Sequence, residues 1–324
     1  MSDRVIGVTL GDPGGIGPEV VLKALQKFLP LQKKGTFFLL LGYLPVLEKT
    51  AQILRLPSNF LLHNHFDPKL LAQDKINVLA PAPFTQFEIG KVDGENGKLA
   101  FNCVRVGAYM AAAELLDVLM TAPVSKEAIQ KTVKDFHGHT EYLAQVAKVK
   151  NFAMMLQGGP LRVVLVTIHL PLKDVARAIS SDLIVSKTEL AHQFLKEELK
   201  RNPKIGVAGL NPHAGEGGVL GREDAEIIAP AVKKLQAKGM NVEGPLAADT
   251  IFRKAYIGQL DAVICMYHDQ GLGPLKMIAF DEGINVTLGL PYRRSSPDHG
   301  TAFDIAYQGK ANSLSTEKAL EFIL

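Results

Sequence analysis

The chain is poor in cysteine, and this narrows the kinds of protein it can be. Among its 324 residues it has two cysteines, Cys103 and Cys265, which are too few for a disulfide framework and do not form a CxxC metal-binding pair. Reduced thiols in a cytoplasmic protein are the simplest interpretation. We expect stability to come from apolar packing, and the chain is long enough for two domains with separate cores.

The chain also lacks a hydrophobic run long enough to span a bilayer. Its most apolar stretch, residues 37–47 (FFLLLGYLPVL), is short and is interrupted by Gly42 and Pro45. The first residues, MSDRVIGVTLGDPGG, have neither the basic nor the apolar region of a signal peptide. We therefore expect no membrane association.

An excess of charge of one sign is absent as well. The formal net charge is +3, from 36 basic and 33 acidic residues, and no basic stripe with interleaved aromatics is present in the sequence. Nothing electrostatic therefore indicates a nucleic-acid partner. With 47% hydrophobic and 21% charged residues, the composition is that of a globular protein.

Short β-branched runs alternate with helical patterns along the chain. The expected strands are residues 5–10, 36–41, 117–121, 161–167, 204–208 and 262–266, and the expected helices are 18–28, 44–54, 98–115, 182–199, 224–238 and 248–257. Residues 80–97 are rich in Pro and Gly and are expected to be irregular. This alternation predicts an α/β fold with a mainly parallel sheet and helices on both faces.

Polar clusters follow many of the expected strands. They are GDPGGIGPE (11–19), TAPVSKEAI (121–129), GHTEYLA (138–144), TIHLPL (167–172), NPHAGEGG (211–218), ADT (248–250) and YHDQGLGPLK (267–276). In α/β sheets ligands bind beyond the carboxyl ends of the strands. Several such ends carrying His, Asn, Asp, Lys and Gly indicate a catalytic cleft, and the last cluster is expected to form a glycine-rich loop.

Three histidines each follow an apolar strand by a few residues, and together they suit a metal site. His169, His213 and His268 supply neutral imidazoles, which bind divalent ions with open positions for substrate or water. Their spacings match no local metal motif. Taken singly, each is better explained as a hydrogen-bonded histidine at the base of a loop.

The remaining histidines divide differently. His63 and His65 are expected in a surface turn, and His192 on a partly exposed helix face. His137 and His139 flank a glycine where a loop enters a helix, a position that favours an anion. A simple N-cap role explains Thr140 equally well.

Two stretches resemble a known group of enzymes. GDPGGIGPEV (11–20) is similar to the GDGIGPE segment of the isopropylmalate and isocitrate dehydrogenases, and HGTAFDIAYQGKAN (299–312) to their cofactor loop. The whole set, GDPGGIGPE, TAPVSK, GHTEYLA, NPHAGE, ADT, YHDQGLGPLK and DHGTAFDIA, resembles the related 4-hydroxythreonine-4-phosphate dehydrogenase (PdxA) family more closely. The resemblance runs from residue 11 to residue 306.

This resemblance implies an isocitrate/isopropylmalate dehydrogenase-like architecture. Each subunit has two α/β/α domains with mainly parallel sheets and an interdomain cleft. We expect a cofactor-side domain of residues 1–125 plus 270–324, and a central domain of residues 126–269 that contributes metal and dimer contacts. The subunits form a homodimer that shares each active site.

The resemblance also implies a reaction. The family oxidises 4-phosphooxy-L-threonine with NAD to 2-amino-3-oxo-4-phosphooxybutanoate, which decarboxylates to 3-amino-2-oxopropyl phosphate in pyridoxal 5'-phosphate biosynthesis. One divalent ion, Zn, Mg or Co, serves each site. Enzymes of the same fold that act on threonate or erythronate 4-phosphate, or on a cyclic dihydrodiol carboxylate, remain alternatives. A non-enzymatic metabolite sensor is a further alternative.

Site residues follow from the family by position. His169, His213 and His268 are the implied metal ligands, with His268 reaching in from the partner subunit. The implied substrate-binding residues are His139, Thr140, Lys276, Asn285 and Arg294. Lys276 and Arg294 are expected in Gly/Pro-rich loops near the phosphate. Asn285 could instead be an ordinary turn residue. Lys126 and Asp249 are candidates for proton transfer. Asp249 could instead cap a helix that starts at Thr250.

The chain has no GxGxxG after its first strand, so a Rossmann-type cofactor site is not indicated. By the resemblance, NAD binds the 299–312 loop, and the candidate contacts are His299, Gly300, Asp304, Ile305 and Asn312. An Asp at position 304 can accept hydrogen bonds from a ribose diol but repels a 2′-phosphate. NAD is therefore favoured over NADP.

Overall fold

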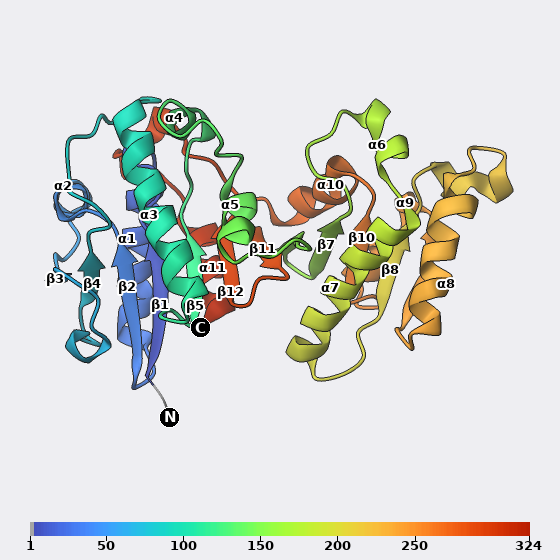
Figure 1. The fold of residues 1–324 in the computed structure, drawn as a ribbon, viewed down its shortest axis with the longest axis horizontal. Coiled ribbons are helices and arrows are strands. Elements are labelled where there is room, and N and C mark those ends of the chain that lie inside the picture. Colours follow the sequence, from blue (N-terminus) through green and yellow to red (C-terminus); the bar gives the residue numbers. More distant parts are fainter. Residues whose placement is uncertain (1–2) are drawn as a thin grey trace. The chain divides into compact units, whose positions relative to one another are not determined.

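The computed structural model describes residues 3–324, which form two compact units. Unit one contains the residues up to Lys150 together with Leu290–Leu324, and unit two contains Asn151–Gly289. In each unit, helices cover the strands (Figure 1).

Unit one is built on a parallel sheet. Its strands lie in the order β3-β4-β2-β1-β5-β12, and every paired neighbour runs in the same direction. The strands are β1 (Arg4–Thr9), β2 (Thr36–Leu41), β3 (Phe60–His63), β4 (Ile76–Leu79), β5 (Val118–Thr121) and β12 (Arg293–Pro297). The inner strands are almost wholly buried, because helices cover both faces.

The helices of unit one form two groups. Helix α1 (Gly17–Phe28) packs against α2 (Leu44–Leu54) and α11 (Leu314–Ile323). Helix α3 (Gly94–Ala112) packs against α4 (Lys126–Gln130) and α5 (His139–Val146). Helix α3 begins earlier than expected, inside the stretch predicted to be irregular. The reason is a cap: the Asp93 carboxylate accepts hydrogen bonds from the amides of Glu95 and Asn96.

The sheet of unit two is mixed. Its order is β11-β6-β7-β10-β8-β9, with β6 antiparallel to both neighbours and the other pairs parallel. The strands are β6 (Ala153–Gly158), β7 (Leu161–Leu165), β8 (Ile205–Ala208), β9 (Val242–Leu246), β10 (Ala262–Cys265) and β11 (Ile284–Leu288). Across both units the sheets are mostly parallel, so the predicted α/β fold is confirmed.

The helices of unit two are α6 (Leu172–Ala178), α7 (Ser181–Leu199), α8 (Ala229–Ala237), α9 (Ala248–Tyr256) and α10 (His268–Ala279), with a π-helical turn at Asp224–Ile228 before α8. Helix α10 occupies the segment that was expected to be a glycine-rich loop, so that expectation was wrong. Its Gly271 allows close packing on the sheet, since an added Cβ would lie 3.0 Å from Cys265 Sγ. Packing thus outweighs the low helix propensity of glycine.

The boundaries between the units differ from those expected from the sequence. Residues 126–150 lie in unit one because α4 and α5 pack on α3, and residues 270–289 lie in unit two because α10 and β11 pack on β6. Each boundary therefore lies about one helix–loop segment later in the chain than expected.

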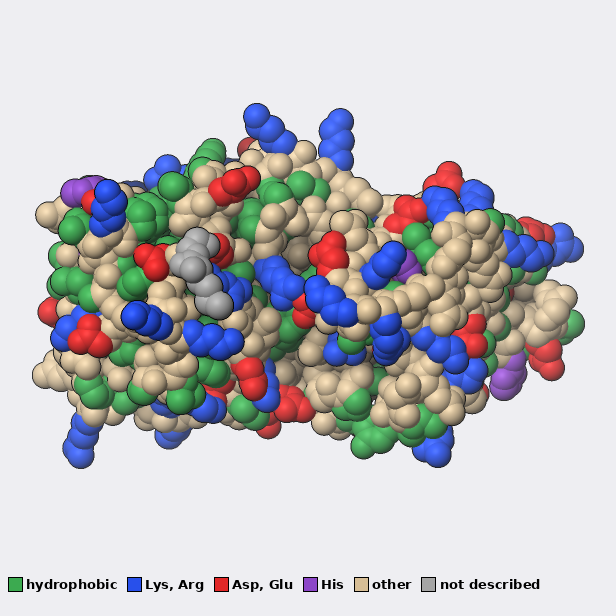
Figure 2. Space-filling view, turned by 90° about the horizontal axis from the view of Figure 1, so that it is seen from below, with side chains coloured by type: hydrophobic (Ala, Val, Ile, Leu, Met, Phe, Trp, Pro, Cys, Tyr) green, Lys and Arg blue, Asp and Glu red, His purple; other side chains and the backbone are tan. Residues whose placement is uncertain are grey.

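The surface and the cysteines fit the composition. Figure 2 shows acidic and basic side chains interspersed over the face it presents. Within residues 3–324, no helix has the length and apolarity needed to cross a membrane. Cys103 and Cys265 are buried and unpaired, and burial raises the pKa of the Cys103 thiol to about 12.

Candidate active site

In unit two, three neighbouring parallel strands end at the same edge of the sheet, and each is followed by one of the candidate histidines. The strands are β7, β10 and β8, in that order. Side chains join their ends: Thr167 Oγ1 donates to the Met266 carbonyl (2.7 Å), and Gln270 accepts from the Met266 amide (2.6 Å) while donating to the Gly209 carbonyl (2.7 Å). These bonds fix the segments that carry His169, His268 and His213.

His169 and His268 lie side by side at this edge. Their ring centroids are 5.7 Å apart with 39° between the planes. A ring bound to zinc has its centroid about 3.2 Å from the metal, so two ligands at a tetrahedral angle have centroids about 5.3 Å apart. The observed separation therefore fits two imidazoles that share one cation.

An adjacent carboxylate orients His268. Asp269 Oδ1 lies 2.6 Å from His268 Nδ1. A carboxylate on Nδ1 fixes the tautomer of the ring and leaves Nε2 as the nitrogen that could bind a metal. Asp269 was quoted in the sequence motif but was not assigned this role; a carboxylate directly after a ligand histidine is the signal that could have identified it.

His213 follows the third of these strands, β8. It is exposed and lies at the start of a run of left-handed residues from His213 to Gly217, with φ of 52° at the histidine itself. The buried Asp224 carboxylate anchors the base of the loop by accepting from the amides of Leu210 and Asn211. Such backbone strain in non-glycine residues is typical of functional segments. Among residues 3–324, no cluster of three or more His, Cys, Asp or Glu side chains is arranged to hold a metal.

In unit one, a second set of candidates gathers around the start of α5. His139 is the first residue of this helix and Gly138 precedes it as the N-cap, so the N-cap role for Thr140 was wrong. The Nε2 of His139 is shielded from solvent and has no hydrogen-bond partner in the described part of the chain. Burial, then the charges of Arg294 and Lys126, lower its pKa, so this imidazole is neutral.

Arg294 is the buried cation of this set. It lies on β12, not in a loop, and is 2% exposed. Its Nε and Nη2 donate to Thr121 Oγ1 at 3.2 and 2.5 Å, which fixes the plane of the guanidinium. Burial lowers the pKa of Arg294 to about 10, partly offset by Tyr292 and Glu141, so the group stays charged at neutral pH. A fixed guanidinium suits bidentate binding of phosphate or carboxylate.

Lys126 completes the cationic character of this region. It is exposed in the first turn of α4, whose N-cap Ser125 accepts from the Ala128 amide (3.1 Å). A Cβ placed on Gly138 would lie 3.4 Å from Lys126 Nζ, so the lysine lies against the loop that leads into α5. Lys126, His139, Thr140 and Arg294 thus form one region, with the N-terminus of α5 adding its free amides. The two cations and the helix amides would suit an anion, although the Glu141 carboxylate also lies beside Gly138.

Two candidate substrate residues lie in unit two. Asn285 is in strand β11, so the turn interpretation was wrong, and its Oδ1 is shielded without a hydrogen-bond partner in the described residues. Lys276 lies in α10, two turns after His268, and not in a loop as expected. Its Nζ is 5.8 Å from the centroid of the Phe280 ring.

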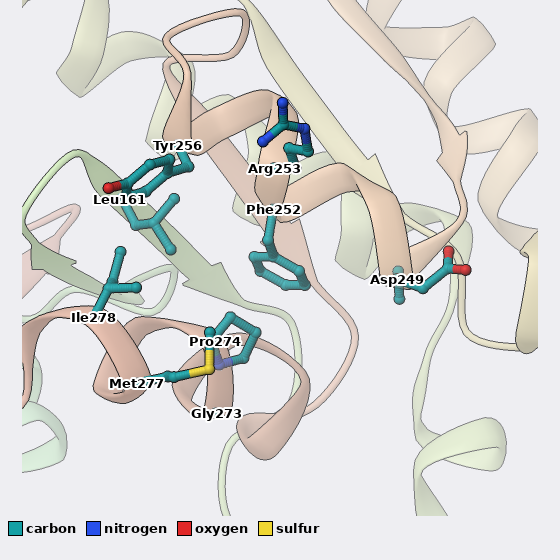
Figure 3. Close-up of a pocket in the computed structure, with 10 residues that line it drawn as sticks. Leu161, Asp249, Phe252, Arg253, Tyr256, Gly273, Pro274, Met277 and Ile278 are labelled. Atoms are coloured by element: carbon teal, nitrogen blue, oxygen red, sulfur yellow. The ribbon is translucent and has the colours of Figure 1, made fainter.

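Asp249 lies in the first turn of α9 at the edge of an apolar groove. The groove is lined by α9, α10 and the start of β7, through residues such as Phe252, Pro274 and Met277 (Figure 3). The Asp249 carboxylate is turned away from these apolar side chains in Figure 3. Helix α9 begins at Ala248 after Ala247, so Asp249 is not the cap of a helix that starts at Thr250.

The candidate cofactor loop packs on the first motif of the chain, inside unit one. The Ile16 amide donates to the Thr301 carbonyl (2.8 Å), and Tyr307 OH donates to the Pro13 carbonyl (2.8 Å). Asp304 and Gly300 are exposed, while His299 and Ile305 are half-buried. Asn312 is exposed, and its Oδ1 accepts from the Leu314 amide (3.0 Å) before α11, which gives it a structural role.

Two further histidines, His63 and His192, lie outside these candidate sets. His192 is half-buried on α7, as expected. His63 was expected in a surface turn, but it lies buried in β3 with Nε2 3.0 Å from Asn77 Oδ1. The strand was missed because it is short and ends in polar residues.

Comparison with known proteins decides the family. The family profile described as "Pyridoxal phosphate biosynthetic protein PdxA" matches residues 34–323. The chain belongs to the PdxA family. It is a PdxA-family dehydrogenase, and the resemblance stated from the motifs is confirmed.

Relatives of this PdxA protein divide between two substrates at similar identity. It is 38% identical over 329 residues to the D-threonate 4-phosphate dehydrogenase of Salmonella typhimurium, covering 100% of this chain and 99% of that one. It is 41% identical over 327 residues to the 4-hydroxythreonine-4-phosphate dehydrogenase of Neisseria meningitidis serogroup A, covering 99% and 97%. The crystal structure of 4-hydroxythreonine-4-phosphate dehydrogenase from Klebsiella pneumoniae superposes with a TM-score of 0.87 at 36% identity, covering 99% and 98%.

Proposed function

We propose that this PdxA protein is a metal- and NAD-dependent dehydrogenase that oxidises the C3 hydroxyl of 4-phosphooxy-L-threonine. The product, 2-amino-3-oxo-4-phosphooxybutanoate, is a β-keto acid and loses CO2 to give 3-amino-2-oxopropyl phosphate. The observation that carries the proposal is the His169–His268 pair, oriented by Asp269 at the ends of parallel strands. A relative named for D-threonate 4-phosphate makes that four-carbon acid the second candidate.

The donor set supports a divalent cation. His169 and His268 have the separation expected of two ligands on one ion, and His213 is the third candidate. Imidazole nitrogen favours Zn or Co, and Mg is the harder alternative. A cation bound there supplies Lewis acidity toward the hydroxyl group and the keto group that replaces it.

The residues of unit one are proposed to bind the anionic ends of the substrate. Arg294, held in place by Thr121, is proposed to supply the buried positive charge for a phosphate, and Lys126 a second one. Neutral His139 can donate or accept a single hydrogen bond, since it carries one proton. In unit two, Lys276 and Asn285 are the other proposed substrate-binding residues.

NAD is proposed to bind the 299–312 loop and to accept the hydride from C3. The exposed Asp304 carboxylate can accept hydrogen bonds from the ribose diol. His299, Gly300, Ile305 and Asn312 are the other proposed contacts. Lys126 and Asp249 are the candidates for proton transfer; the exposure of both side chains permits exchange of protons with water.

We propose a homodimer in which both subunits contribute to each metal site. Since His169 and His268 are neighbours in one chain, we assign His213, rather than His268, to the partner subunit. An apolar surface on α9 and α10 supports contact with a second copy of the chain: Tyr256 is 53% exposed, Met277 82% and Phe280 72%. Exposed aromatic and methionine side chains are typical of such interfaces.

Subunit mixing tests this assignment. The variants His213→Ala and His268→Ala are each expected to be inactive. When equal amounts are mixed at random, half of the dimers are heterodimers, and each heterodimer has one intact site of two. The mixture should therefore recover about a quarter of wild-type activity. Mixing His169→Ala with His268→Ala should restore none, because both ligands come from one chain. Recovery in the second mixture instead would show that His268 crosses the interface.

Metal analysis tests the chemistry. His213→Ala is expected to lose the bound metal and nearly all turnover while remaining folded, as judged by circular dichroism. Full activity of the wild-type protein after metal stripping and in excess chelator would remove the cation from the mechanism. A protein that binds the substrate but neither metal nor NAD would be a sensor instead.

A further inference from the structure

The motif GDPGGIGPE (11–19) has no role in the chemistry proposed above, although it is the first strand-end cluster of the chain. Its last residue, Glu19, lies in the first turn of α1 and is 0% exposed. A fully buried carboxylate is costly unless it is paired and hydrogen-bonded. Its partners therefore show what the motif holds in place.

All the partners of Glu19 belong to α1 or to the end of the proposed cofactor loop. Its Oε1 accepts from the Ala311 amide (3.0 Å) and from Lys23 Nζ (2.8 Å), and its Oε2 accepts from the Gly309 amide (3.3 Å). Lys23 Nζ in turn donates to the carbonyls of Gly309 (3.0 Å) and Ala311 (2.8 Å). The ion pair thus binds the N–H and C=O groups of the same two loop residues.

The other end of the loop is attached to the same motif. The Thr301 carbonyl accepts from the Ile16 amide, and the Tyr307 hydroxyl donates to Pro13. Ile16 and Val20 also pack in one apolar cluster with loop residues that include Ala306 and Ala311. Between these attachments lies the exposed Asp304.

We propose that Glu19, paired with Lys23, is a positioning residue that sets the cofactor loop in the conformation that binds NAD. Glu19 is buried and does not itself touch the cofactor. It acts through Gly309 and Ala311, the latter directly before Asn312. This inference rests on the proposed function, since it takes the 299–312 loop as the NAD site.

The Glu19→Gln variant tests the role at constant side-chain shape. It removes the charge and turns one acceptor into a donor, so it breaks charge-assisted bonds that are about twice as strong as neutral ones. We expect KM and Kd for NAD to rise at least ten-fold. The kcat at saturating NAD, the KM for the phosphorylated substrate and the metal content should stay within about two-fold of the wild type, because no group that reacts has changed.

A second variant and a matched control keep the test decisive. Lys23→Met removes the paired cation from a partly exposed position and should raise KM for NAD in the same direction, and the double variant should show less than the product of the two effects because the residues act as a pair. Glu48→Gln, an exposed acid on α2, should change nothing. If Glu19→Gln does not fold, Lys23→Met carries the same comparison.

Hydrogen exchange separates this inference from the proposed function. In Glu19→Gln and Lys23→Met, the amides of Gly309 and Ala311 should exchange faster, while those of β1 should not change. If the wild-type protein reduces NAD but both variants keep its KM for NAD and its exchange at these amides, the positioning role is refuted alone. If the wild type neither binds nor reduces NAD, the proposed function is refuted. The role of Glu19 in cofactor binding is then refuted as well, even if the exchange result shows that Glu19 holds the loop.

Discussion

Replacing Asp12 by Asn should change how stability depends on pH. Asp12 lies in the loop after β1 and is 0% exposed. Its Oδ1 accepts from the Gly14 amide (2.9 Å), but its Oδ2 is shielded without a hydrogen-bond partner in the described residues. Burial raises the pKa of this carboxyl from 3.8 to about 6, and the hydrogen bond from the Gly14 amide opposes the shift.

The sign and size follow from proton linkage. Between these two pKa values the folded state binds the proton more strongly than the unfolded state, so the free energy of unfolding falls as the pH rises. A shift of about two units corresponds to about 3 kcal/mol lost between pH 4 and pH 7. Asn keeps an acceptor for Gly14 and does not titrate. Asp12→Asn should therefore gain about 3 kcal/mol over the wild type between pH 4 and pH 7.

The assay is urea unfolding at several pH values between 4 and 7.5, with hydrogen exchange of the β1 amides to assign the transition of unit one. Asp74→Asn, a change at an exposed acid, serves as the control and should follow the wild type at every pH. If the free energy of unfolding of Asp12→Asn depends on pH as that of the wild type does, the folded protein ionises Asp12 with little loss of stability. The reasoning from its burial would then be refuted.

Three further changes test the site. Asp269→Asn should lower the affinity for the metal by about 10- to 100-fold, because a carboxylate partner makes the ligand imidazole more basic; equal metal affinity in a competition titration would show that Asp269 does not tune His268. Arg294→Lys should raise the KM for the phosphorylated substrate by about 10-fold or more, since an ammonium group cannot reproduce the planar guanidinium that Thr121 holds in place, whereas an unchanged KM would place the phosphate elsewhere. Asp304→Lys should weaken NAD and reduce the preference for NAD over NADP, and cofactor kinetics equal to those of the wild type would exclude Asp304 from the ribose site.

The sequence was most informative where strands are buried on both faces. The expected strand at 36–41 and helix at 44–54 coincide with β2 and α2, because an unbroken apolar run and a proline-led helix have few alternatives. Strand β3 and helix α10 were missed or misread for tertiary reasons. His63 is buried only because Asn77 on β4 satisfies it, and Gly271 is helical because it packs on Cys265.

For the site, strand-end logic and the family motifs found the residue types but not their grouping. His169 and His268 were correctly placed after buried strands. That these strands are neighbours, and that Thr167 and Gln270 align their ends, is known only from the structure. The left-handed backbone of His213 has no local sequence signal. Glu19 and Lys23 have the i,i+4 spacing of a helical ion pair, but nothing local in the sequence shows that Glu19 also binds Gly309 and Ala311.

The central claim is that histidine-bound metal and NAD together oxidise a phosphorylated four-carbon hydroxy acid. The most direct measurement is NADH formation, followed by absorbance, from 4-phosphooxy-L-threonine and from D-threonate 4-phosphate, each with and without chelator. We expect NADH from 4-phosphooxy-L-threonine at the higher kcat/KM, loss of the signal in chelator, and recovery on adding Zn or Co. Undiminished NADH formation in chelator, or none from either phosphorylated acid with metal present, would contradict the account.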